Sequence, residues 1–329
     1  MSKPQVIVYG YNASPFYQKL LSVLAVLRVE HAICATPPVM PRPMLSEELG
    51  ITYRRIPVMA IDGEVYCDTS IAIEELDARF GGRQGHGKSL FAVHGTLQKR
   101  LVAHWSDREV FMLAAGLIPL QALSKEFIED RKGFAAAPIG KASPALSKSQ
   151  LLTHLASLET MLSESASQYL MGTETPQYLD LGAAFALHWL RTGLKAVPEL
   201  LPLDGNGPYP KVLAWLTAVD GYVNSCRSGK PPRISSSDAA DAIAKAGAAA
   251  VQKVQDAAGV SASDPTGLQK GDVVEVTPRD SGRVPQRGAL LALSDRRITL
   301  RVDGKRGPVL VHFPRAFFDV RVPKEQAKL

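Results

Sequence analysis

Two predicted helix starts carry side chains that could stabilise an anion. Ser14-Pro15 follows residues 6–10, a β-branched and aromatic run that predicts a buried strand. Serine is a favoured N-cap and proline is tolerated at the first helical position, so we expect a helix to begin there. Asp68-Thr69 is a second such start. Hydroxyl and N–H donors at a helix N-terminus favour a bound anion, so these two places are the first candidates for chemistry.

The elements that must position these residues alternate between strand and helix over residues 5–80. An apolar-rich segment from Tyr17 to Leu27 predicts the first helix. Residues 55–70 predict a strand, a hairpin turn at Asp62-Gly63, a second strand and then the second helix start. One further element is placed only loosely, around residues 32–35. We therefore expect a small sheet with helices attached to it.

This stretch resembles the N-terminal thioredoxin-like domain of the soluble glutathione transferases, most closely the serine-type classes and fungal relatives. Ala13-Ser14-Pro15-Phe16 stands where those enzymes have their catalytic serine, and Arg55-Ile56-Pro57-Val58 stands where they have a basic residue and a cis-proline. Asp68-Thr69 stands where they usually have Glu-Ser. The resemblance implies an α/β thioredoxin-like domain, a following all-helical domain, glutathione as co-substrate and no metal.

The resemblance implies that Ser14 donates a hydrogen bond to the glutathione sulfur and favours its thiolate, with Asn12 as a second donor. A serine does not have to lose its own proton for this role. No cysteine occupies position 14 or the three positions after it, so thiol–disulfide exchange through a mixed disulfide with the protein is not expected. The alternative is that Ser14 is an ordinary N-cap.

The other matched residues would hold the tripeptide. Ile56 would pair its backbone with the cysteinyl part of glutathione, and a cis bond to Pro57 would keep that backbone accessible. The alternative is an ordinary edge-strand proline. The Asp68 carboxylate would bind the γ-glutamyl ammonium, while the Thr69 hydroxyl and nearby N–H groups would bind its carboxylate. Asp-Thr departs from the usual Glu-Ser, which puts the strength of binding in question.

The glycyl carboxylate would pair with Arg55 or Arg42. Either arginine could instead be a solvated surface charge, and for Arg42 we favour that reading. The electrophile pocket would lie between the two domains, although Trp105 and Trp215 are residue types found more often in a core. The residues expected to line it are Tyr11, the loop from Pro37 to Leu45, Trp105, Met112 and Trp215.

Length and composition indicate several domains. The chain has 329 residues, of which 46% are apolar, which is too long for one compact core. The polar N-terminus predicts no signal peptide, and no apolar run reaches the roughly 18 to 20 residues that span a bilayer. Cys34, Cys67 and Cys226 have no metal-ligand spacing, which favours a reducing compartment, with Cys67 as a core residue.

We predict four parts. Residues 1–82 form the glutathione-binding domain, 88–232 an all-helical domain, 233–267 an Ala-rich helix and linker, and 268–329 a small basic β domain. In the helical domain, apolar spacing predicts helices over 91–123, 147–169, 178–192 and 209–223. Asp180 is expected to cap its helix and to have no catalytic role. The Ala-rich segment, 235–258, is expected to be solvated or loosely packed.

From Gly271 the apolar pattern changes to a period of two, and five short runs separated by turn residues predict an SH3-like barrel. Residues 265–329 hold 13 Lys and Arg against 7 Asp and Glu, which accounts for the whole net charge of +6. Only Phe313, Phe317 and Phe318 are aromatic here, so packing of the barrel on the helical domain is favoured over nucleic-acid binding.

Two functions from different classes remain. The first is an enzyme that conjugates glutathione to an electrophilic small molecule, or uses it to isomerise one. The second is a non-catalytic protein of the same fold that uses its basic β domain for protein or RNA contacts. We expect a cytoplasmic location, with a peroxisomal alternative because Ala327-Lys328-Leu329 resembles a C-terminal peroxisomal signal. Many two-domain transferases dimerise, although the tail could block that surface.

Overall fold

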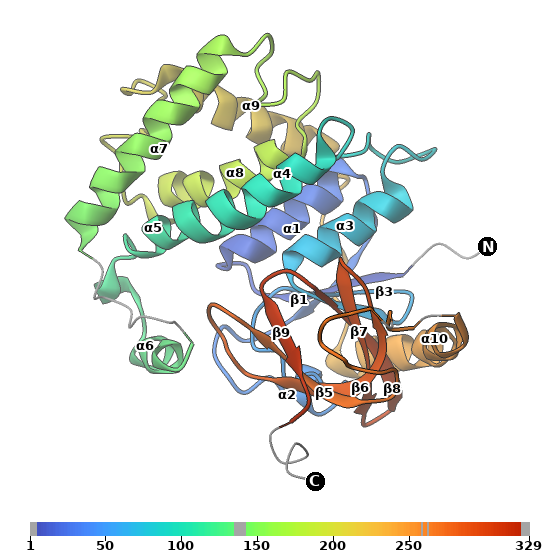
Figure 1. Cartoon of the computed structure of the whole chain (residues 1–329). Helices are drawn as coiled ribbons and strands as arrows, with labels where there is room; N and C mark the ends of the chain where they lie inside the picture. The colour runs from blue at the N-terminus through green and yellow to red at the C-terminus, as the bar shows by residue number, and fades with distance from the viewer. Residues whose placement is uncertain (1–4, 135–142, 258, 262, 324–329) are drawn as a thin grey trace.

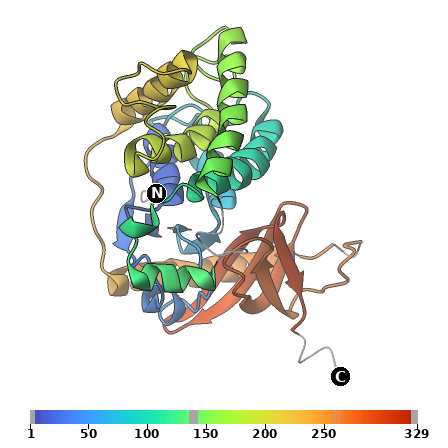
Figure 2. The ribbon, with the colours of Figure 1, turned by 90° about the vertical axis from the view of Figure 1, so that its left-hand side faces the viewer.

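A computed structural model describes residues 5–134, 143–257, 259–261 and 263–323. Figures 1 and 2 show a helical half stacked on a strand-rich half, with α1 and α3 between them. Among the described helices, none is both long enough and apolar enough to cross a bilayer. The terminal Ala327-Lys328-Leu329, on which the peroxisomal alternative depends, lies outside the described residues.

The N-terminal part has the predicted order of elements. The hairpin turn at Asp62-Gly63 joins two strands as expected, and the loosely placed element is a strand. A short helix, α2, occupies part of the Pro-rich loop. The elements are β1 (Val6–Gly10), α1 (Pro15–Val26), β2 (Ala32–Ala35), α2 (Pro43–Ser46), β3 (Val58–Ile61), β4 (Glu64–Cys67) and α3 (Thr69–Phe80).

The middle of the chain is helical. Its first predicted helix, 91–123, is shorter than expected because Gly116 and Pro119 follow its last turn. Asp180 caps its helix as predicted, since its carboxylate accepts from the backbone N–H of Gln177 and Leu170. The elements are α4 (Gly95–Leu101), the π-helix η1 (Val102–Val110), α5 (Phe111–Ala115), the 3-10 turn η2 (Leu120–Ala122), α6 (Lys125–Lys132), α7 (Pro144–Glu164), α8 (Tyr178–His188), the π-helix η3 (Trp189–Leu194) and α9 (Pro210–Cys226).

The C-terminal part has one long helix and five strands. The five strand runs predicted from the period of two are confirmed, although β6 begins earlier than its apolar run. The elements are α10 (Ser236–Ala257), β5 (Val273–Pro278), β6 (Gln286–Leu293), β7 (Arg297–Gly304), β8 (Gly307–Pro314) and β9 (Phe318–Arg321).

The C-terminal strands extend the N-terminal sheet. Strand β8 pairs in parallel with β4, with Tyr66 opposite His312, so that one nine-stranded sheet has the order β2-β1-β3-β4-β8-β7-β6-β5-β9. Figure 1 shows the strongly curled C-terminal portion beside and below β1 and β3. We expected this region to pack mainly on the helical domain. That expectation is wrong, because its largest shared core is with the thioredoxin-like sheet.

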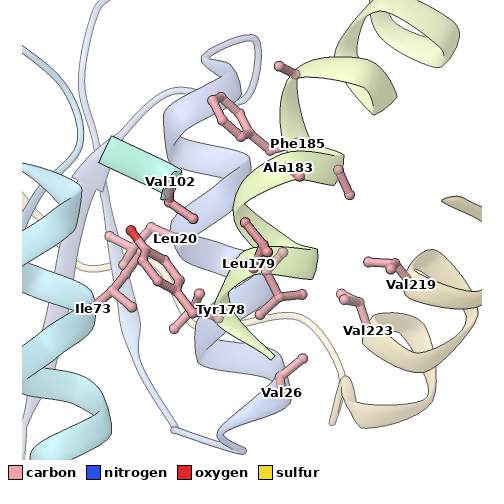
Figure 3. Close-up of a cluster of buried hydrophobic side chains, with 14 of the residues drawn as sticks. Leu20, Val26, Ile73, Val102, Tyr178, Leu179, Ala183, Phe185, Val219 and Val223 are labelled. Carbon is pink, nitrogen blue, oxygen red and sulfur yellow. The ribbon is translucent and has the colours of Figure 1, made fainter. Parts of the chain in front are cut away.

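Each face of the first strand belongs to a different core. Val6 and Val8 belong to the core formed with α1, α3 and the helical domain. Figure 3 shows side chains of α1, α3, α8 and α9 meeting in this core. Ile7 and Tyr9, on the opposite face, pack with residues of α10 and the C-terminal strands. The strand is therefore buried on both sides, which explains why it reads as a continuous apolar run.

Helix α10 packs more closely than its alanine-rich sequence indicated. Ala239, Ala240 and Ile243 are at most 1% exposed, so the expectation of a solvated or loosely packed helix is wrong. The reason is the small size of its side chains, which lets the helix approach the β3–β4 hairpin. A Cβ atom placed on Gly63 would lie 2.3 Å from the backbone nitrogen of Gly247.

This contact makes a prediction about stability. Gly63→Ala and Gly205→Ala both place alanine at a positive φ, 84° and 82°, but Gly205 has no neighbour within 4 Å. Both variants should lose about 1 kcal/mol for the backbone conformation. Gly63→Ala should lose roughly 1 to 3 kcal/mol more, because its methyl group overpacks α10. Urea unfolding measures the difference, and equal losses would show that α10 is loosely packed after all.

Candidate active site

The register of three strands brings the predicted site residues to one edge of the sheet. Tyr9 of β1 pairs with Val58 of β3, and Val58 pairs with Cys67 of β4. Both β1 and β4 run antiparallel to β3, so their carboxyl ends lie at the same edge. Ser14 follows the first of these ends and Asp68 follows the second, while the Ile56-Pro57 bond enters β3 between them. The two helix starts and this peptide bond therefore form one group.

Ser14 caps α1 and keeps a hydrogen atom to donate. Its hydroxyl oxygen accepts from the backbone N–H of Tyr17 at 3.3 Å, and its side chain is buried. Because a serine hydroxyl has acceptor lone pairs and one O–H donor, capping does not use the donor. The N-cap and the thiolate-stabilising reading are therefore compatible. Asn12 is exposed, and its backbone carbonyl accepts from the Gln18 side chain at 2.8 Å.

The second half of the site lies around the start of α3. The Ile56-Pro57 bond is cis, as the resemblance implied. Asp68 caps α3, with Oδ1 accepting from the backbone N–H of Ser70 at 2.9 Å and from its hydroxyl at 2.7 Å. Asp68 has a φ of 101°, a conformation that is rare outside glycine and that concentrates at functional sites. Thr69 is buried beside it.

The two predicted carboxylate-binding arginines have different surroundings. Arg55 lies at the site, with Nη1 3.8 Å from Asp68 Oδ2. Arg42 is only 3% exposed and donates to the carbonyl oxygens of Pro37, Pro38 and Arg54. Burial lowers the pKa of Arg42 to about 10. The solvated role that we favoured for Arg42 is therefore wrong, since its guanidinium fixes the Pro-rich loop.

The residues predicted to line the electrophile pocket are dispersed. The Tyr11 hydroxyl accepts from Arg131 Nη2 at 3.3 Å, which brings α6 to the site. The Trp105 indole N–H donates to His154 of α7 at 3.1 Å, and Met112 is 55% exposed. Trp215 is a core residue that donates to Asp180. A hollow beside the predicted loop is lined by Val39, Met40, Lys125, Glu126, Glu129 and Asp130.

A buried ion pair that the sequence did not reveal holds α1 against the helical domain. Lys19 is fully buried and donates to Asp107 of η1 at 2.6 Å. Its ammonium also lies 5.1 Å from the ring centre of Phe185 and 5.3 Å from that of Tyr178. Burial raises the pKa of Asp107, and the Lys19 charge opposes that rise. The pair fixes the helix whose first turn presents Ser14.

The two cysteines at this end of the sheet, Cys34 and Cys67, are both buried. Cys67 precedes Asp68 directly but is fully buried, and burial raises the pKa of its thiol well above the usual value. Burial also raises the pKa of Cys34 to about 11. Within the described residues, no group of three or more His, Cys, Asp or Glu side chains is placed to hold a metal ion.

Comparisons with known proteins agree with this geometry. Residues 8–84 match the family model of the glutathione S-transferase N-terminal domain. Residues 113–228 match a domain of unknown function, DUF7962. A solved GST-like protein from Pseudomonas syringae is 26% identical, with a TM-score of 0.67, and the match covers 96% of this chain and 99% of that one. Residues 8–84 therefore carry a glutathione S-transferase N-terminal domain, and the fold of the whole chain is that of a GST-like protein.

The solved structures differ in how much of this chain they match. Poplar glutathione transferase F1, in a serine-to-cysteine mutant form, is 14% identical with a TM-score of 0.50. That match covers 68% of this chain and 98% of the poplar chain. The Pseudomonas protein matches nearly the whole chain. No curated protein matches the sequence.

The Lys19–Asp107 pair can be tested by unfolding. Asp107→Asn leaves a buried ammonium without its carboxylate and should lower the free energy of unfolding by about 3 to 5 kcal/mol. The double variant Lys19→Met/Asp107→Leu removes both charges and should stay within roughly 2 kcal/mol of the parent.

Lys148→Met is the control, because it breaks the more exposed pair with Glu199, which measures 2.6 Å. It should change stability by less than about 1 kcal/mol. If Asp107→Asn has as small an effect as this control, the buried pair does not hold α1 in place.

Proposed function

We propose that the protein binds reduced glutathione at the end of the sheet where β1 and β4 finish. There it would stabilise the glutathione thiolate for reaction with an electrophilic small molecule. The observation that supports this most is the single row formed by Tyr9, Val58 and Cys67. That row brings together the Ser14 hydroxyl, the Ile56-Pro57 backbone and the Asp68 carboxylate. The match of residues 8–84 to the glutathione S-transferase N-terminal domain supports glutathione as the ligand that would use all three.

Three parts of glutathione would have a partner in this arrangement: the thiol, the cysteinyl backbone and the γ-glutamyl ammonium. The Ser14 hydroxyl and the N-terminus of α1 would both favour the thiolate over the thiol, since each interacts better with the anion. The backbone at Ile56 would pair with the cysteinyl residue. Asp68 would bind the γ-glutamyl ammonium through Oδ2, because Oδ1 is already used by Ser70.

The chemistry that follows would be conjugation or isomerisation. In conjugation, the thiolate sulfur forms a bond to the electrophilic carbon, and the tripeptide stays in the product. In isomerisation of an activated double bond, the sulfur adds, rotation occurs about the resulting single bond, and the sulfur leaves again. Ser14 serves both reactions in the same way, by lowering the free energy of the sulfur anion.

The alternative of a binding protein with a free basic surface has less support. Several C-terminal arginines are paired within the chain. Arg297 lies 2.8 Å from Glu75, Arg306 lies 2.8 Å from Glu48, and Arg315 lies 3.2 Å from Asp264. These three side chains face other parts of the same molecule, where they help to hold the C-terminal region in place.

The proposal predicts how an aspartate variant binds glutathione. Asp68→Asn keeps an N-cap acceptor and tolerates the positive φ, but removes the charge that would pair with the ammonium. Calorimetric titration of the parent should show binding in the millimolar range or tighter. The variant should bind about tenfold more weakly or worse, as expected for a lost hydrogen bond to a charged group.

Asp62→Asn is the control for this titration. Asp62 also has a positive φ, 50°, but lies at the other end of β4. Its affinity should match that of the parent. A folded parent that releases no heat with several millimolar glutathione would contradict the proposed function.

A further inference from the structure

The loop after β5 places a carboxylate between two arginines of the candidate site. Arg55 donates through Nη2 to the Asp280 carboxylate and through Nε to the Ser281 carbonyl at 2.9 Å. The other oxygen of Asp280 lies 3.3 Å from Nη2 of Arg108, which belongs to η1. One carboxylate is therefore shared by a guanidinium from the thioredoxin-like part and one from the helical part.

The loop between β8 and β9 contacts Arg108 as well, through Phe317. The Arg108 guanidinium lies 3.4 Å from the ring centre of Phe317, and the His104 ring lies 4.7 Å from the same ring. Phe317 has a φ of 66°, which is unusual for an aromatic residue and costs roughly 1 to 3 kcal/mol. The contacts that hold this loop in place, which include the Arg108 and His104 contacts with Phe317, must offset that cost.

We propose that Arg55 and Arg108 form a binding site for a ligand carboxylate, with Asp280 as its internal occupant that the ligand displaces. Two guanidiniums that converge on one carboxylate are a strong carboxylate site, because charge-assisted hydrogen bonds form on both sides. This inference rests on the proposed function and adds Arg108 to the site. It also makes the C-terminal region a competitor for the ligand that the N-terminal domain would bind.

The exposure of Asp280 indicates that it can leave this position. Its side chain is 38% exposed, whereas that of Arg55 is 15% exposed, so the carboxylate lies on the solvent side of the pair. Burial alone would raise the pKa of Asp280, but the charges of Arg55 and Arg108 bring it below its usual value. The carboxylate is therefore ionised at neutral pH and competes as an anion. When it leaves, Arg55 still has Asp68 beside it.

The test compares glutathione binding by Asp280→Asn with that by the parent and by Asp319→Asn. Asp319 is an exposed acid of the same region that pairs with Arg279 at 3.6 Å. Asp280→Asn should tighten binding about three- to tenfold, as expected if Asp280 occupies the site for roughly 70 to 90% of the time. Asp319→Asn should leave the affinity unchanged. Adding Arg108→Gln to Asp280→Asn should remove the gain.

A second measurement follows the loop itself. Hydrogen–deuterium exchange of residues 279–284 in the parent should rise when glutathione is added, because binding releases the loop. The glycine ethyl ester of glutathione identifies the carboxylate. If Asp280→Asn does not bind the ester more tightly than the parent does, the glycyl carboxylate is the group that occupies the Arg55–Arg108 site. If Asp280→Asn binds the ester more tightly by the same factor as glutathione, the γ-glutamyl carboxylate is that group.

The outcomes separate this inference from the proposed function. If the parent binds glutathione and Asp280→Asn binds equally well or more weakly, with no rise in exchange, Asp280 only docks the C-terminal region and the inference is overturned. If no variant binds, the proposed function fails and the inference fails with it.

Discussion

The site depends on the backbone pairing of three short strands whose faces are both covered. The row of Tyr9, Val58 and Cys67 fixes where each chain segment leaves the sheet, and the side chains of these segments supply the chemistry. Strands of four or five residues hold this register because the helical domain packs on one face and the C-terminal region packs on the other. The C-terminal region is thus part of what shapes the N-terminal site.

Local signals in the sequence predicted much of this site, and long-range contacts account for what they missed. The caps at Ser14-Pro15 and Asp68-Thr69 can be expected from neighbouring residues alone, whereas the cis Ile56-Pro57 bond was expected from the family resemblance. Asp280 lies in a segment whose sequence indicates a turn, but nothing in a turn pattern says that it meets Arg55. The burial of α10 was missed because its buried face consists largely of alanines. These small side chains are buried because the helix lies close to the sheet, and alanine in a sequence does not by itself indicate burial.

The same arginine illustrates how one side chain can serve both fold and ligand. Arg55 bridges the thioredoxin-like part to the C-terminal region through Asp280 and Ser281, and it also lies beside Asp68. Contacts that stabilise the docked region therefore use groups that a bound tripeptide would need. In such a protein, ligand affinity depends on whether the C-terminal loops occupy the arginines that the ligand would use. This dependence requires no change in the sheet.

The most direct measurement is the pKa of the glutathione thiol when bound, followed by ultraviolet absorbance of the thiolate as pH is varied. The account predicts a pKa below that of free glutathione, and a higher value in Ser14→Ala at saturating glutathione. Ser143→Ala is the matched control, because Ser143-Pro144 caps α7 in the same way at a distance from the site. A bound thiol whose pKa equals the free value, or is unchanged by Ser14→Ala, would contradict the central claim.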